Sequence, residues 1–206
     1  MTVSPRAPAP PDRTTPSPED DARLIERSGR HPEAFARLYD RHAPSIHRYV
    51  ARRLGDQAAD DVVAETFLAA FRRRDRYDPA RPDARPWLYG IAANLVGKHR
   101  RAETRMLRAL ARTGADPVTD AMDRVDARVS AAAASRPLAG ALADLPQGDR
   151  DVLLLVAWAD LSYEQVAEAL SIPVGTVRSR LHRARRKVRA ALGGTDPTDV
   201  QEGTGE

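Results

Sequence analysis

Hydrophobic residues recur along this chain at the intervals of α-helices, and no useful length shows the strict alternation of a half-buried strand. The clearest periodicity lies in the stretch 161–188. Its second half carries an apolar stripe with steps of four, three and four residues, formed by Val177, Leu181, Ala184 and Val188. The pattern predicts an all-α protein. Its core must be built from Ala, Leu and Val, because aromatic residues make up only 5% of the sequence.

Two short helices separated by a turn are predicted within this stretch. Ser162 is a candidate N-cap with Gln165 three residues later, which is the spacing of a capping box. Ser171 interrupts the periodicity, and Pro173 suits the first turn of the next helix. Glycine is common at this turn position. A serine in the left-handed conformation there would cost on the order of 1 kcal/mol. The arrangement is typical of a helix-turn-helix.

The second of these helices has a basic outer face, with no acidic residue between 178 and 189. Such a helix fits the DNA major groove, where its N-terminal half reaches base edges and arginine suits guanine. Residues further along are placed to meet phosphates. The candidate DNA-binding residues are Thr176, Arg178, Ser179, His182, Arg183 and Arg186. The alternative is a solvated basic helix on a small bundle, but the turn, the stripe and the charge asymmetry agree with DNA binding.

The first half of the chain predicts further helices. The segment 32–54 carries an apolar face, and we expect Pro44 to kink or restart the helix. Asp56 is a candidate cap for the next helix, 56–71. The expected core face of that helix consists of Val62, Val63, Phe67, Leu68 and Phe71. After a loop, the stretch 87–101 predicts another helix, with an apolar line formed by Leu88, Ile91 and Leu95.

The outer face of helix 56–71 is acidic, and the segment contains no basic residue. Its candidate contact residues are Asp60, Asp61 and Glu65. An acidic face of this kind is often only solvated. A sharper interpretation is a dock for a basic partner surface, because charge complementarity speeds encounter and rejects wrong partners. A metal site is a third interpretation, although carboxylates at helical spacing suit Mg²⁺ poorly without a phosphate ligand.

A loop rich in arginine and proline, 72–86, precedes the helix 87–101. A basic loop next to a helix face bearing amide and basic side chains suits a single nucleic-acid strand. The candidate residues are Arg76, Tyr77, Arg81, Asn94, Lys98 and Arg101. Tyr77 could stack on a base or simply pin the loop. We expect Trp87 to belong to the core rather than to form a stacking platform.

Composition narrows the class of protein further. The net charge is +4, with 33 Lys and Arg against 29 Asp and Glu, which favours an anionic partner. The chain has no cysteine, so it has no disulfide and no thiolate metal site. No apolar run reaches the roughly 18 residues of a membrane span, and the Pro-rich start is unlike a signal peptide. We expect a soluble, cytoplasmic protein without cofactor or membrane insertion.

The domain organisation follows from composition and periodicity. The predicted arrangement is a disordered Pro-rich tail over 1–18, a helical domain over 19–112, a flexible linker over 113–134, a helix-turn-helix domain over 135–192 and a disordered acidic tail over 193–206.

Three stretches together resemble a known family. They are ADDVVAETFLAAF at 59–71, WLYGIAANLVGKHRR at 87–101, and LADLPQGDRDVLLLVAWADLSYEQVAEALSIPVGTVRSRLHRAR at 142–185. In order and spacing they resemble a bacterial ECF (extracytoplasmic function, group 4) RNA polymerase sigma factor of the sigma-70 family. The resemblance covers about 160 residues, and its most specific part is GTVRSRLHRAR.

The resemblance implies two helical domains, sigma2 and sigma4, that bind core RNA polymerase and recognise promoter −10 and −35 elements. By position, Asp60, Asp61 and Glu65 would meet the clamp helices of the polymerase, while sigma4 would meet its flap. The residues of the loop 76–86 and of the helix behind it would hold the −10 strand. The recognition helix would read the −35 element. An anti-sigma factor is a further partner that the resemblance allows.

Two alternatives remain open from the residues themselves. A stand-alone helix-turn-helix regulator predicts a dimer on a palindromic site, but the chain has no heptad zipper and no spare apolar face. An enzyme is disfavoured by the absence of cysteine and of a G-x-S-x-G motif. The five histidines also show no metal-ligand spacing. We therefore predict no catalytic residues and no metal site.

Overall fold

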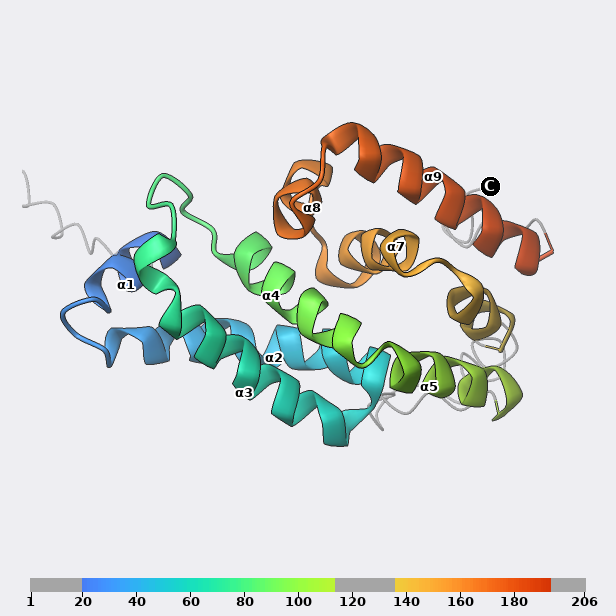
Figure 1. Cartoon of the computed structure of the whole chain (residues 1–206), viewed down its shortest axis with the longest axis horizontal. Helices are drawn as coiled ribbons and strands as arrows, with labels where there is room; N and C mark the ends of the chain where they lie inside the picture. The colour runs from blue at the N-terminus through green and yellow to red at the C-terminus, as the bar shows by residue number, and fades with distance from the viewer. Residues whose placement is uncertain (1–19, 114–135, 194–206) are drawn as a thin grey trace, which may run out of the picture.

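The computed structural model describes residues 20–113 and 136–193 (Figure 1). The N-terminal half contains α1 (Asp21–Arg27), α2 (Ala34–Leu54), α3 (Asp56–Arg72), the short 3₁₀ helix η1 (Arg74–Arg76), α4 (Arg85–Lys98) and α5 (Arg100–Thr113). The C-terminal half contains a helical segment over 136–144, then α7 (Gln147–Ala159), α8 (Tyr163–Leu170) and α9 (Val174–Ala191). Within these two ranges there is no strand and no helix long and apolar enough to cross a membrane. The all-α prediction is therefore confirmed.

Helices α2 and α3 form an antiparallel hairpin that α4 covers (Figure 1). Pro44 lies inside α2, which runs on as one helix, so the restart is wrong, while the alternative of a kink at Pro44 remains a prediction. Pro44 is exposed, and water can therefore bond the carbonyl oxygen that the ring leaves without a donor. The cap of α3 is also different from the prediction. Gly55 precedes the helix with φ of 86°, and Asp56 is its first residue.

The core face of α3 is confirmed except at one position. Val62, Val63 and Phe67 are buried and Phe71 is half-buried, whereas Leu68 is 48% exposed. Adjacent helical residues point about 100° apart, because a turn takes about 3.6 residues. With Phe67 directed at the core, Leu68 lies on the outer surface beside Glu65.

The predicted single helix 87–101 is two helices. His99 ends α4, and its backbone N–H donates to the carbonyl of Val96, three residues back, at 2.8 Å. This tighter hydrogen bond breaks the helical path, and α5 begins at Arg100. Arg101 therefore lies on a different helix from Asn94 and Lys98.

The helix-turn-helix agrees with the sequence in detail. Ser162 and Gln165 form the reciprocal capping box, and Ser171 is left-handed with φ of 52°. Pro173 occupies the N-cap position of α9, one residue before the position predicted. The apolar stripe of α9 is buried against α7 and α8 at Val177, Leu181, Ala184 and Val188. The sequence did not show that α8 also packs against α4 of the other half (Figure 1).

The predicted domain limits fall close to the observed helix ends. The α5 helix runs to Thr113, one residue beyond the expected end of the first domain. The linker from 114 on and the tails over 1–18 and 194–206 lie outside the described residues, so the predictions of flexibility and disorder remain predictions. The buried side chains of both halves form one continuous hydrophobic cluster.

Candidate nucleic-acid interface

The first candidate surface is the outer face of α9. Its apolar stripe fixes the rotation of the helix, so that Arg178, Ser179 and His182 are exposed on the other side, with Arg186 one turn further along. Thr176 is half-buried near the start of the helix. The Ser179 hydroxyl donates to the Thr176 carbonyl at 3.0 Å, which leaves its oxygen lone pairs directed outward. The positions agree with those predicted, while their DNA contacts remain a prediction.

Arg183 differs from the other candidates because it is held within the protein. Its guanidinium donates through Nε and Nη2 to the two carboxylate oxygens of Asp149, at 3.1 and 2.9 Å. The Asp149 side chain is only 8% exposed, whereas that of Arg183 is 51% exposed. This two-point pair joins α9 to α7. Asp149 is not among the predicted site residues, since no local pattern links residues 34 positions apart.

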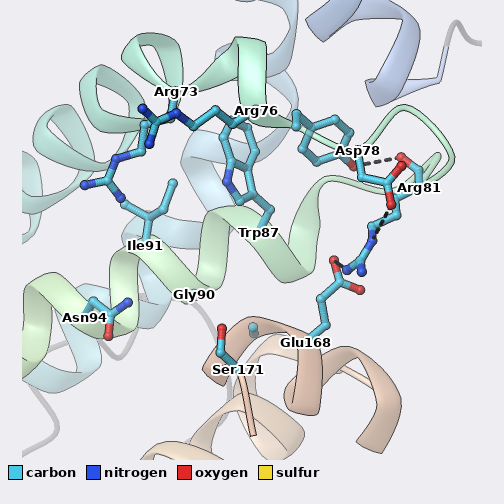
Figure 2. A pocket seen from close by; sticks show the side chains of 12 residues that line it. Arg73, Arg76, Asp78, Arg81, Trp87, Gly90, Ile91, Asn94, Glu168 and Ser171 are labelled. Carbon is cyan, nitrogen blue, oxygen red and sulfur yellow. Dashed lines mark hydrogen bonds and ion pairs between the residues drawn. The ribbon is translucent and has the colours of Figure 1, made fainter.

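The second candidate surface is a cleft of about 400 Å³ beside the arginine-rich loop (Figure 2). We call it the arginine cleft. The N-terminal half contributes Arg73, Arg76, Tyr77, Asp78, Arg81, Trp87, Gly90, Ile91 and Asn94 to its walls, and α8 with its C-cap residue contributes Glu168, Ala169 and Ser171. Four predicted strand-binding residues therefore share one concave site. Lys98 and Arg101 do not line it.

Tyr77 holds the loop at the mouth of the arginine cleft. Its ring packs on Trp87 with centroids 4.9 Å apart, and its hydroxyl donates to the Arg81 carbonyl at 2.7 Å. Burial raises the pKa of Tyr77 far above its usual range, so the hydroxyl stays protonated and able to donate. Trp87 is half-buried and lies both in the core and along the cleft wall. Tyr77 therefore pins the loop and Trp87 belongs to the core, while stacking of either ring on a base remains a prediction.

The remaining candidates of this surface lie along exposed helix faces. Asn94 and Lys98 are exposed on α4, one turn apart, and Arg101 is exposed on α5. The Lys98 ammonium lies 3.3 Å from the Glu65 carboxylate of α3. Lys98, a candidate DNA-binding residue, thus contacts Glu65 of the acidic face of α3.

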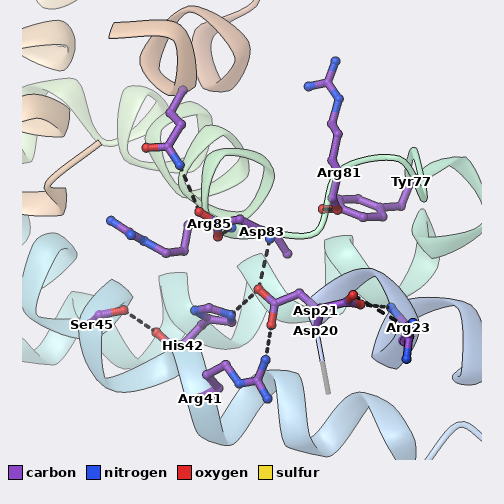
Figure 3. Close-up of polar contacts among 12 residues, drawn as sticks. Asp20, Asp21, Arg23, Arg41, His42, Ser45, Tyr77, Arg81, Asp83 and Arg85 are labelled. Carbon is purple, nitrogen blue, oxygen red and sulfur yellow. Dashed lines mark hydrogen bonds and ion pairs between the residues drawn. The ribbon is translucent and has the colours of Figure 1, made fainter. Parts of the chain in front are cut away.

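A buried aspartate fixes the loop to the helical bundle (Figure 3). Asp21 accepts from Arg41 at 2.6 Å and from the backbone N–H of Ala84 at 3.0 Å, and its carboxylate lies 2.8 Å from His42 Nε2. Burial raises the pKa of Asp21, but the contacts with His42, Ala84 and Arg41 outweigh it, so the pKa lies below its usual value. No local pattern of residues indicates this role, since the partners are far apart in the chain.

The acidic face of α3 lies on the opposite side of the hairpin from its core. Asp60, Asp61 and Glu65 are all exposed, and Asp60 lies 3.1 Å from His47 Nε2 of α2. Leu68, one turn after Glu65, adds an exposed apolar side chain to this face. In the described part of the chain, no three His, Asp or Glu side chains converge to hold a metal ion.

Comparison with known proteins places both halves in one class. Residues 38–106 match the family model of sigma-70 region 2, and residues 135–188 match that of sigma-70 region 4. The fold and its two surfaces therefore define a sigma-70 type transcription initiation factor. The curated relatives narrow this further, and the chain belongs to the ECF RNA polymerase sigma factors.

The relatives cover most of the chain. The ECF RNA polymerase sigma factor SigL of Mycobacterium tuberculosis is 38% identical over 158 residues, which are 75% of this chain and 86% of SigL. The sigma factor CarQ of Myxococcus xanthus is 32% identical over 163 residues, 78% of this chain and 90% of CarQ. Among solved structures, CnrH in complex with the cytosolic domain of CnrY is 31% identical with a TM-score of 0.58, covering 85% of this chain and 99% of CnrH.

These matches decide between the functional alternatives. They extend over both halves in the family order, so the chain is a promoter-directing transcription initiation factor and not a stand-alone regulator. The resemblance described from the sequence is thereby confirmed.

Proposed function

We propose that α9 reads the −35 element and that the arginine cleft holds the separated −10 strand, while the acidic face of α3 docks on core RNA polymerase. The observation that carries this proposal is the presence of two basic surfaces of different shape in one chain. One is a convex helix that fits a duplex groove, and the other is a concave loop site with aromatic walls.

On α9, Arg178 is the residue best placed for base readout. It is exposed in the N-terminal half of the helix, where a recognition helix reaches base edges. Ser179, His182 and Thr176 surround it, and Arg186 lies where a phosphate would be. Arg183 stabilises the angle between α9 and α7 through Asp149, and its exposed guanidinium edge adds positive charge.

The arginine cleft suits an unstacked base. Taking a base out of the duplex costs a few kcal/mol, and stacking on an aromatic face returns about 1–3 kcal/mol. Trp87 and Tyr77 supply aromatic surface, Asn94 supplies both a donor and an acceptor, and Arg76 and Arg81 supply charge for phosphates. Lys98 and Arg101 extend the positive charge along α4 and α5.

The acidic face of α3 fits a basic partner surface with an apolar centre. Asp61 and Glu65 provide charge for a fast, salt-sensitive encounter, and Leu68 provides apolar area that a partner would bury. The clamp helices of the polymerase are the proposed partner, with the flap as the partner of the C-terminal half. Catalysis would belong to the polymerase, and the chain would act in the cytoplasm, where transcription takes place.

The decisive experiment is in vitro transcription with core RNA polymerase on a pool of templates with randomised upstream sequence. Sequencing the transcripts gives the promoter preference. With the chain present we expect transcripts that share a −35 and a −10 sequence. Arg178→Ala should relax the preference at one or two −35 positions. Arg185→Ala, a matched control further along α9, should weaken all promoters alike. Unchanged preference in Arg178→Ala would contradict the −35 assignment.

A second experiment tests the acidic face. The double change Asp60→Lys and Asp61→Lys should weaken binding to core RNA polymerase by at least tenfold at physiological salt. The matched control is Glu26→Lys with Glu33→Lys, which makes the same charge change at exposed positions of the N-terminal half outside the acidic face of α3. Equal affinities for both doubles would return α3 to a merely solvated surface.

An anti-sigma factor is a further proposed partner. The related CnrH was solved with the cytosolic domain of CnrY, and the sigma factor RpoE of Bartonella quintana was solved with the anti-sigma factor NepR.

A further inference from the structure

A row of basic residues runs along the edge of α9 that lies beside the start of α7 (Figure 1). Its members are spaced by three and four residues, so they share one side of the helix: Arg180, Arg183 and Lys187. Lys187 Nζ donates to the Asp144 carbonyl at 2.7 Å. Arg180 lies across the first turn of α7, because a Cβ built on Gly148 would be 2.8 Å from its Nη1. The start of α7 is thus fixed against α9 at two points that flank Arg183.

Arg183 uses only one edge of its guanidinium inside the protein. Nε and Nη2 donate to the two carboxylate oxygens of Asp149, at 3.1 and 2.9 Å. A guanidinium has five N–H donors in one plane, so this pair leaves both N–H bonds of Nη1 and one of Nη2. Those on the outer side of Nη1 and Nη2 point forward from the tip of the side chain. Because the Arg183 side chain is exposed although Asp149 covers its Nε edge, the tip is the part that faces water.

Asp149 is a rigid support for this contact. It lies in the first turn of α7, and its side chain is buried. Its backbone N–H donates to the Pro146 carbonyl at 3.0 Å. The N-terminal end of a helix also favours a negative charge, because the positive ends of the peptide dipoles lie there. The carboxylate is therefore held in place by its helix, and the guanidinium of Arg183 is ordered on it.

The tip of an arginine held in this way matches guanine. Guanine presents two acceptors, O6 and N7, in the major groove, and an arginine that approaches end-on can donate to both. An exposed arginine without a support must lose rotamer freedom when it binds, which weakens binding by about 2- to 12-fold. Asp149 orders the side chain before DNA is bound, so most of this loss has already occurred in the free protein.

The carboxylate of Asp149 also has an opposite effect on other DNA sequences. A negative charge near the DNA surface repels phosphates, and this repulsion acts on every sequence alike. Only a sequence that offers acceptors to the ordered tip of Arg183 gains enough to offset it. Asp149 thus raises the ratio of specific to non-specific binding, and this ratio is what decides promoter choice.

We propose that Asp149 is a positioning residue for promoter recognition, which orients the tip of Arg183 to read a guanine of the −35 element. This inference rests on the proposed function of α9 and deepens it, because it names the base and the residue that orients its reader. The pair reaches beyond the joining of α9 to α7, since the edge of Arg183 that Asp149 leaves open is the one that fits the base.

The test measures the base preference of the holoenzyme at every −35 position. The full chain and core RNA polymerase transcribe templates randomised over the −35 element, each with a transcribed barcode that identifies its promoter. Asp149→Asn keeps the volume of the side chain but presents an NH₂ group to the guanidinium in place of one oxygen. We expect the preference for a G·C pair to fall by about 2- to 12-fold at one position. Preferences at the other positions, including those that depend on Arg178, should equal those of the parent.

Two further variants complete the design. Arg183→Ala alone would leave the buried carboxylate of Asp149 without its partner, so the fold could be lost. The double variant Asp149→Asn with Arg183→Ala removes both charges and should abolish the G·C preference at the same position. The matched control Asp144→Asn makes the same charge change at an exposed residue and keeps the backbone carbonyl that binds Lys187. It should equal the parent at every position.

A second readout separates positioning from packing. Affinity of the holoenzyme for duplex without a promoter should stay equal or rise in Asp149→Asn, because a negative charge is removed. A fall in preference at all −35 positions together would show that Asp149 only sets the angle between α7 and α9, and would overturn the proposal. An unchanged preference in Asp149→Asn, or a loss confined to a position where the parent prefers an A·T pair, would overturn it too. Absence of any −35 preference in the parent would instead contradict the proposed function of α9.

Discussion

Replacement of Glu103 by glutamine should be among the most destabilising single changes in this protein. Glu103 is fully buried and accepts from Arg53 at 2.6 Å and from Arg150 at 2.9 Å. Glutamine keeps the volume but has one oxygen acceptor, so one arginine must face its NH₂ group. Removing one partner of a buried ion pair costs about 3–5 kcal/mol, since the remaining charge is left uncompensated.

The magnitude can be bounded from the remaining contacts. Arg53 keeps Asp151 and Tyr49, and Arg150 keeps the carbonyls of Ala143 and Leu145. The loss should therefore lie near the lower end, about 3 kcal/mol. With a slope of about 2 kcal/mol per molar urea, this lowers the unfolding midpoint by about 1.5 M.

The assay can follow each half separately. The chain has two tryptophans, Trp87 on α4 and Trp158 on α7, so Trp→Phe variants leave one fluorescent reporter in either half. Because Glu103 of α5 joins Arg53 of α2 to Arg150 of α7, the unfolding midpoint should fall for both reporters. The matched control is Glu65→Gln, whose partner Lys98 is 67% exposed; it should change stability by less than about 0.5 kcal/mol. If Glu103→Gln cost no more than this control, the reasoning from buried charge would fail.

Three further predictions concern other sites. Asp21→Asn should lower the unfolding free energy at pH 7 by about 3 kcal/mol. The pKa of Asp21 is lower in the folded protein than its ordinary value of 3.8, so its ionised form contributes to the free energy of unfolding above pH 3.8, and this contribution is lost as the pH falls further. The stabilities of variant and parent should therefore converge in acid, and a constant difference would exclude ionisation as the cause. Leu68→Ser should leave the melting temperature within about 2 °C while weakening polymerase binding by about tenfold, because Leu68 is exposed in the isolated chain; a lower melting temperature would show that Leu68 packs in the core. Ser171→Gly should raise the unfolding free energy by up to about 1 kcal/mol, because it relieves a left-handed serine, and a loss would mean that the hydroxyl has a role.

The helix-turn-helix shows how far local sequence signals reach. The capping box at Ser162, the turn at Ser171 and the stripe ending at Val188 all depend on residues within four positions of each other. Such interactions are fixed by helix geometry, so they can be recognised without knowledge of the rest of the fold. The positions of the candidate DNA-binding side chains on α9 follow from the same periodicity.

Predictions failed where the outcome depended on solvent exposure or on a turn without a sequence signal. Pro44 is tolerated inside α2 because it faces solvent, and nothing nearby in the sequence shows which side that is. Leu68 is apolar, but it lies outside the face of α3 that packs on the core, so its side chain is exposed. His99 ends α4 although the surrounding residues favour a helix.

The sequence by itself determined the helices, the two basic surfaces, the acidic face and the family, because each is written in residue types at short, regular spacing. Only the tertiary structure decided which charges are buried and which surfaces meet. Arg53 and Asp151 are 98 positions apart, and their hydrogen bond exists because the two halves pack together. Contacts of this kind arise from shape and burial across the whole molecule, and no local pattern of residues records them.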